Sequence, residues 1–146
     1  MVFILLFFLY LLFVAMLIIG WDQYHKLTFR KGQEFESLIS VIIPARNEGD
    51  KIKFLLEDIR RQSYQAFEVI VVDDHSRDNT SDAVIAFTHS DPRFILIRND
   101  GEGKKAALNA GIRASKAAII VTTDADCRVE VKWLRTLSSY FQSAGT

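Results

Sequence analysis

Residues 118–127 read AIIVTTDADC, an apolar run that leads directly into two carboxylates, Asp124 and Asp126. The run predicts a buried β-strand, and burial of an unpaired carboxylate is costly. The two acids are therefore expected at a rim of the fold, where they face solvent, a metal ion or a charged ligand. Taken alone, the pair fits a helix cap about as well as a metal site.

Short apolar runs alternate with helical periods before this stretch. Strands are predicted over 38–43, where Pro44 ends the run, and over 67–72 and 93–97. Strands that alternate with helices of about 10–15 residues indicate parallel βαβ units. Near-continuous apolar strands indicate a sheet covered on both faces. The predicted fold class is therefore α/β, with a doubly wound, mostly parallel sheet.

The predicted helices each have an apolar face. The face of the 48–61 helix consists of Ile52, Leu55, Leu56 and Ile59, at spacings i, i+3, i+4 and i+7. A helix that opens near Thr80 is expected to pack through Ala83, Val84 and Phe87. The 104–114 helix is expected to bury Leu108 and Ile112, and a final helix Val131, Leu134, Leu137 and Phe141.

Polar residues gather where the predicted strands end, and ligands bind beyond the carboxyl ends of strands in such sheets. These residues are 44–48, 73–76, and the pair Asp124 and Asp126. Two carboxylates one residue apart can share a Mg²⁺ ion that also takes water and phosphate oxygens. Asp73 and Asp74 suit a sugar hydroxyl or a base N–H, while Asp78 or Thr80 caps the next helix. The alternative for the two aspartates is a plain capping turn. Lys104 and Lys105 follow a glycine-containing loop at a helix start and could meet a phosphate, with a solvated lysine pair as the alternative.

Several function classes are disfavoured by what the chain of 146 residues lacks. It has no G-x-G-x-x-G after the first strand and no G-x-x-x-x-G-K-[ST], which disfavours nicotinamide, flavin and P-loop nucleotide sites. Its formal net charge is zero, so no nucleic-acid partner is indicated. Cys127 has no Cys–His arrangement and is expected to be a small buried residue.

The apolar run 2–19 is long enough for a transmembrane helix, and Trp21 and Tyr24 follow at the position of an interfacial belt. A cleaved signal peptide is the alternative, but no basic residue precedes the run and no small-x-small site follows it. The expected domains are a transmembrane helix over 1–21, a linker over 22–37 and an α/β domain over 38–146. Basic residues follow the helix, which predicts a cytoplasmic domain at a bacterial inner membrane.

Four motifs, taken in order, resemble those of the family 2 glycosyltransferases of the GT-A fold. They are SVIIPARNE (40–48), VIVVDDHSRDNT (69–80), GKKAALNAGI (103–112) and TTDADC (122–127). The resemblance covers about residues 38–141. It implies a nucleotide-diphosphate-sugar site that uses a divalent cation, Mg²⁺ or Mn²⁺. The donor-binding residues that it implies are Pro44, Ala45, Arg46, Glu48, Asp73, Asp74, Lys104 and Asp124, and the metal ligands are Asp124 and Asp126.

The activity that the resemblance implies is inverting transfer of a hexosyl or N-acetylhexosaminyl group. The donor would be a nucleotide sugar, with a UDP-sugar favoured, and the acceptor a glycan or a lipid-linked molecule. The family's catalytic base and acceptor-binding half follow the D-x-D motif, so the base is expected beyond Thr146 and no catalytic residue within this chain. The chain therefore resembles a donor-binding half, in which residues 38–146 form a donor-binding domain that is incomplete at its C-terminus. The alternative is a non-catalytic, membrane-tethered nucleotide-sugar-binding module.

Overall fold

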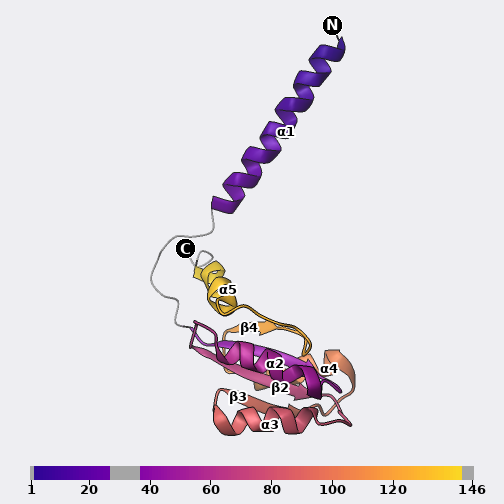
Figure 1. The fold of residues 1–146 in the computed structure, drawn as a ribbon, viewed down its shortest axis with the longest axis vertical. Helices are drawn as coiled ribbons and strands as arrows, with labels where there is room; N and C mark the ends of the chain where they lie inside the picture. Colours follow the sequence, from indigo (N-terminus) through magenta and orange to yellow (C-terminus); the bar gives the residue numbers. More distant parts are fainter. Residues whose placement is uncertain (1, 27–36, 143–146) are drawn as a thin grey trace. The chain divides into compact units, whose positions relative to one another are not determined.

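The computed structural model describes residues 2–26 and 37–142. These residues belong to two units, of which Phe35–Leu137 contains a β-sheet and the other contains the helix α1 (Val2–Lys26). The elements after α1 are, in chain order, β1 (Ile39–Ala45), α2 (Gly49–Arg60), β2 (Phe67–Asp73), α3 (Thr80–Ser90), β3 (Phe94–Arg98), α4 (Gly103–Ala114), β4 (Ile119–Thr122) and α5 (Trp133–Gln142) (Figure 1). Each strand lies where the sequence predicts one.

The sheet is parallel, and its strand order is β3-β2-β1-β4. In the register, Ile39 of β1 lies between Phe67 of β2 and Ile119 of β4. The chain proceeds outward from β1 to β3 and then returns to the other side of β1 to form β4. The strand order therefore reverses between the neighbouring strands β1 and β4, and doubly wound sheets bind ligands beyond the carboxyl ends of the strands at such a point.

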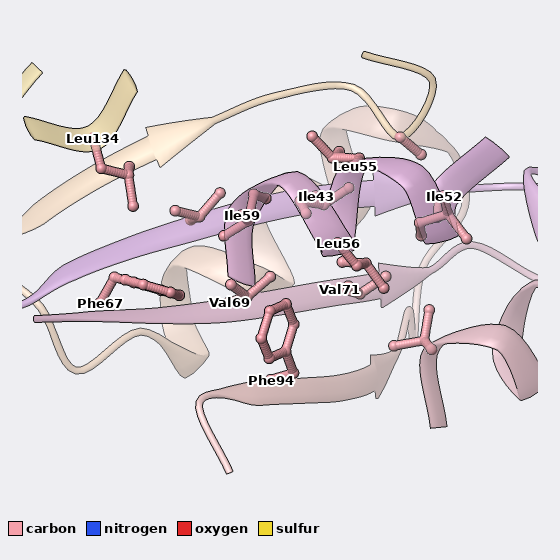
Figure 2. Close-up of a cluster of buried hydrophobic side chains, with 14 of the residues drawn as sticks. Ile43, Ile52, Leu55, Leu56, Ile59, Phe67, Val69, Val71, Phe94 and Leu134 are labelled. Carbon is pink, nitrogen blue, oxygen red and sulfur yellow. The ribbon is translucent and has the colours of Figure 1, made fainter. Parts of the chain in front are cut away.

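The main core lies between the sheet and α2. All four residues of the predicted apolar face of α2 are fully buried, which confirms that prediction. Figure 2 shows these side chains, among them Ile52 and Leu56, over Ile43 of β1 and Val71 of β2. Val84 of α3 belongs to the same cluster, as predicted. The opposite face of the sheet is covered by α4.

The buried face of α4 consists of small residues, so the prediction that Ile112 is buried was wrong. Ile112 is 44% exposed, whereas Ala107 and Gly111 are buried. A Cβ atom at Gly111 would lie only 2.4 Å from Cγ2 of Ile42. The helix approaches the sheet so closely at this position that only glycine fits.

β1 continues through Pro44, whereas the sequence predicted that the strand would end there. Proline donates no hydrogen bond and is rare inside a central strand. The backbone polar groups of successive residues of β1 point alternately toward β2 and toward β4. The Ala45 carbonyl accepts the N–H of Asp74, next to β2, at 2.8 Å, and the Ile42 carbonyl accepts the N–H of Thr123, next to β4, at 3.2 Å. Pro44 therefore faces the β4 side, at a level where β4 has already ended. The missing N–H costs the sheet no hydrogen bond.

α5 begins two residues later than Val131, which explains one wrong prediction about its buried face. Val131 precedes the helix and is 49% exposed, and Phe141 is 46% exposed. Leu134 is fully buried, as predicted.

The N-terminal helix α1 extends to Lys26, beyond the predicted limit of residue 21. Within 2–26 and 37–142, no helix meets the combined requirements of length and apolarity for crossing a membrane, so the predicted transmembrane helix is not confirmed. Most of the predicted linker, residues 27–36, lies outside the described residues.

Candidate active site

The carboxyl ends of β1, β2 and β4 meet at one cleft of about 420 Å³. Its walls include eight of the nine side chains for which the sequence predicts donor or metal binding. The residues that line it are Pro44, Ala45, Arg46, Glu48, Asp74, Gly103, Lys104, Asp124, Ala125 and Asp126. Asp73 is the predicted residue that does not line it. Gly103 and Ala125 line the cleft although the sequence did not single them out.

The loop that follows β1 is held by the loop that follows β2. The Asn47 N–H donates to Ser76 Oγ at 3.0 Å, and Asn47 Oδ1 accepts the Arg77 N–H at 2.8 Å. The Glu48 N–H donates to Thr80 Oγ1 at 2.9 Å. Asn47 takes a positive φ of 56°, a region in which asparagine is one of the few tolerated side chains. These bonds fix the wall of the cleft that Arg46 and Glu48 form.

Both carboxylate oxygens of Asp78 also join the loops that follow β1 and β2. Oδ2 accepts the Gly49 N–H at 3.0 Å, and Oδ1 accepts the Thr80 N–H at the same distance. The carboxylate therefore joins the first turns of α2 and α3. The sequence predicted a helix cap at Asp78 or Thr80, but the link to α2 was not foreseen.

Asp74 is buried at the end of β2 and anchors the start of α4. Its Oδ1 accepts the Asn99 amide at 2.7 Å, and both oxygens accept the Gly103 N–H, at 3.0 and 3.1 Å. Burial alone would raise the pKa of Asp74, but the bonds from Asn99 and Gly103 and the nearby Arg46 together hold that pKa below its usual value. Asn99 is itself buried, so this anchor is shielded from solvent.

Asp73 has a structural role instead of lining the cleft. Its Oδ1 accepts the Ser76 N–H at 3.1 Å, and its Oδ2 accepts the Ser81 hydroxyl at 2.8 Å. The two bonds run to the turn after β2 and to the first turn of α3. The neighbouring residue His75 has φ of 58°, and its Nε2 lies 2.9 Å from the Gly101 carbonyl, so it joins two loops at the rim.

The two acids of the D-x-D motif are exposed on either side of a buried alanine. Ala125 is 4% exposed and packs in the main core, which turns Asp124 and Asp126 outward. Lys104 Nζ lies 2.6 Å from Asp124 Oδ1. The hydrogen bond to Asp124, reinforced by that residue's charge, raises the pKa of Lys104.

A second cleft of about 390 Å³ adjoins the first and shares Pro44, Lys104 and Asp124 with it. Cys127 lies in its wall and is exposed, so the prediction of a buried thiol was wrong. The reason is local. Ala125 supplies the small buried residue of this loop, and Cys127 follows where the chain has returned to the surface.

The donor set of the first cleft fits a hard divalent cation that has few protein ligands. Among the described residues no group of three or more His, Cys, Asp or Glu side chains is placed to hold a metal ion. Asp124 and Asp126 offer two carboxylates, and Mg²⁺ commonly binds one or two while it keeps waters and substrate phosphates. The residues present therefore fit a cation that is completed by a bound diphosphate.

The segment after the D-x-D motif is held by the end of α2. The amide of Gln62, which is 1% exposed, donates to the Glu130 carbonyl at 2.7 Å and accepts the Leu134 N–H at 2.9 Å. Both carboxylate oxygens of Asp58 accept hydrogen bonds from the guanidinium group of Arg128, at 2.6 and 3.0 Å. Neither polar side chain is marked by a motif, so the sequence did not reveal this anchor.

Residues 40–146 match the family model described as glycosyl transferase family 2. The chain belongs to glycosyl transferase family 2. A relative, the glycosyltransferase AglE of Haloferax volcanii, is 37% identical over 110 residues, which are 73% of this chain and 36% of that protein. The dolichyl-phosphate beta-glucosyltransferase of Dictyostelium discoideum is 31% identical over 121 residues, which are 75% of this chain and 37% of that protein.

A solved structure supports the same assignment. The mannosyltransferase PcManGT from Pyrobaculum calidifontis, in complex with GDP-Man and Mn²⁺, has a TM-score of 0.67 and 29% identity, and the match covers 92% of this chain and 41% of that one. The mostly parallel α/β sheet predicted from the sequence is therefore that of a family 2 glycosyltransferase. The chain spans about a third of the length of the curated relatives it matches.

Proposed function

We propose that this chain is the donor-binding part of a glycosyltransferase and binds a nucleotide-diphosphate sugar together with a divalent cation. The observation that carries the proposal is the cleft beyond β1, β2 and β4. Its lining combines Asp124 and Asp126 with residues of the segment 44–48, which reads PARNE and is called the PARNE loop below. The whole enzyme would transfer the sugar to a glycan or a lipid-linked acceptor with inversion. The base that deprotonates the acceptor is assigned to no residue of this chain.

The nucleoside would lie between the PARNE loop and Asp74. Glu48 Oε2 is buried and makes no well-aligned hydrogen bond among the described residues, although Lys51 Nζ lies 3.3 Å away. A buried carboxylate oxygen of this kind is costly unless a donor reaches it. A ribose hydroxyl would supply that donor. Arg46, which is 58% exposed, is free to turn from Asp74 toward the ligand.

The diphosphate would lie between Lys104 and the D-x-D acids. Asp124 and Asp126 would hold the cation, and Lys104 would offer a further positive charge. The cation, when bound, neutralises charge on the departing nucleotide diphosphate. The mannosyltransferase of P. calidifontis, with its GDP-Man and Mn²⁺, is the relative that supports this cation for the present chain.

Calorimetry on the full chain tests the proposal. UDP and GDP are titrated in turn, each with and without Mn²⁺, and UDP is expected to bind more tightly. Asp126→Asn is expected to abolish the gain from Mn²⁺, whereas Asp82→Asn, an exposed position at the start of α3, leaves it unchanged. If neither nucleotide produces heat at millimolar concentration, the proposal is contradicted.

We also propose that α1 attaches the chain to a membrane, with the glycosyltransferase domain on the cytoplasmic side. Large apolar side chains are exposed along the helix, among them Phe3, Phe13, Met16 and Ile19. Extended apolar surfaces mark interaction sites or membrane contacts. One relative acts, by its name, on dolichyl phosphate, which is a lipid.

Flotation with liposomes tests the attachment. The wild-type chain is expected to float, and Phe13→Asp combined with Leu17→Asp to remain at the bottom of the gradient. Ile85→Asp places one such charge on an exposed apolar position of α3 and is the control. Carbonate extraction then separates insertion from surface binding. A wild-type chain that stays at the bottom contradicts the proposal.

A further inference from the structure

Lys104 and Asp124 form an ion pair at the boundary between the two clefts. Nζ of Lys104 lies 2.6 Å from Oδ1 of Asp124, and both residues border both clefts. The side chains are 62% and 55% exposed, respectively. The ammonium group therefore occupies space that is open to a ligand from either side.

The backbones of both partners are fixed, while the lysine side chain can move. Lys104 follows Gly103, whose N–H is held by Asp74. Asp124 precedes the buried Ala125, and its carbonyl accepts the Cys127 N–H at 3.2 Å. Exposed ion pairs contribute little stability, and lysine has a flexible four-carbon stem. The pair can therefore separate without disturbing either anchor.

A second pair of a basic and an acidic side chain also lines the first cleft. Arg46 NH1 lies 3.6 Å from Asp74 Oδ2, so the two basic side chains that line the cleft are both placed beside its acids. A divalent cation on Asp124 would share that carboxylate with an ammonium group, and two positive charges at such a distance repel each other. A diphosphate would offer Lys104 a replacement partner of the same sign as Asp124.

We propose that Lys104 competes with the divalent cation for Asp124 and leaves that carboxylate for the diphosphate when the donor binds. The inference rests on the proposed function, and it adds an order of events. Without the donor, the cation binds more weakly than it would bind to Asp124 and Asp126 if Lys104 were not paired with Asp124. The donor frees Asp124, and the cation frees Lys104, so that each strengthens the binding of the other by the same factor.

The test titrates Mn²⁺ alone against the full chain in mild detergent, with the free ion followed by electron paramagnetic resonance. Lys104→Met is expected to tighten Mn²⁺ binding about two- to fivefold, the range set by an exposed ion pair. Lys104→Arg keeps the positive charge and is expected to bind Mn²⁺ no more tightly than wild type. Lys105→Met, which removes the same charge from the next, exposed residue of α4, is the matched control and should leave the affinity unchanged.

The second half of the test adds UDP. With UDP present the effect of Lys104→Met reverses, because the variant has lost its contact with the diphosphate, and the Mn²⁺–UDP complex binds more weakly than to wild type. Equal urea midpoints for all four proteins show that the fold is intact. This inference alone is overturned if the wild type binds Mn²⁺ and UDP but Lys104→Met binds Mn²⁺ alone no more tightly than the wild type does. If no protein binds either ligand, the proposed function fails as well.

Discussion

The carboxylate of Asp74 accepts the backbone N–H of Gly103 through both of its oxygens, at 3.0 and 3.1 Å. Gly103 has φ of 83°, which favours glycine, and it begins α4. The end of β2 is thereby joined to the helix that carries Lys104. An acid at this position is consequently part of the frame of the cleft as well as part of its lining.

Asp74 and Asp73 are expected to respond differently to the same change. Asp74→Asn weakens the contacts to both Gly103 and the ligand, so nucleotide affinity should fall about tenfold or more, with a loss of about 1–3 kcal/mol in stability. Asp73→Asn disturbs only the turn held by Ser76 and Ser81, so stability falls while nucleotide affinity changes little. Calorimetry and urea unfolding of the two variants give the comparison. Equal losses of affinity would assign both acids to the ligand.

Gly111→Ala should destabilise the protein by about 1–3 kcal/mol, the usual cost of overpacking a core. The added Cβ would lie 2.4 Å from Ile42 Cγ2, so α4 or β1 must shift. Urea unfolding measures the effect. Asn109→Ala, at an exposed position of the same helix, is the control and should be neutral or slightly stabilising because alanine favours helix. A neutral Gly111→Ala would mean that α4 packs more loosely than described.

Gln62→Leu should cost about 2–4 kcal/mol, since it leaves the Glu130 carbonyl and the Leu134 N–H without their partner. The effect is measured by urea unfolding, with the exposed residue Ser63 changed to alanine as control. Because the segment after Asp126 loses an anchor, Mn²⁺ binding should weaken too. Unchanged stability would show that water replaces the amide without loss.

Acid should destabilise the sheet-containing unit through its paired aspartates. The hydrogen bond from Arg128 holds the pKa of Asp58 below its usual value, and that from Arg93 does the same for Asp91, although burial opposes both shifts. A lowered folded-state pKa stabilises the fold above the unfolded value of about 4, and this stability is lost as the pH falls through the folded value.

Urea midpoints are therefore expected to be level between about pH 7 and 5 and to fall below about pH 4. Asp91→Asn should reduce the fall, and the exposed Asp82→Asn should not. A midpoint that rises on acidification contradicts this account.

The sequence predicted most of the frame because its signals are local. Apolar runs mark the strands, and acids at their ends mark the cleft at the reversal of strand order. It could not separate Asp73 from Asp74, which are adjacent yet bind different elements. The sequence also led to the wrong buried face for α4, because the distance between the helix and the sheet decides whether small residues such as Gly111 are buried. Long-range anchors such as Gln62 depend on residues about 70 positions away and leave no local pattern.

Pro44 has a consequence for the shape of the site. The next donor along β1 on the β4 side would be the nitrogen of Pro44, and it carries no hydrogen. β4 pairs with β1 only as far as Thr122, so the missing donor lies where the chain leaves the sheet, just before Asp124. The β1 backbone therefore offers β4 no further donor at the level where the cleft opens. A residue with an N–H at position 44 would allow one further hydrogen bond between the two strands, at the expense of the space that we propose for a diphosphate.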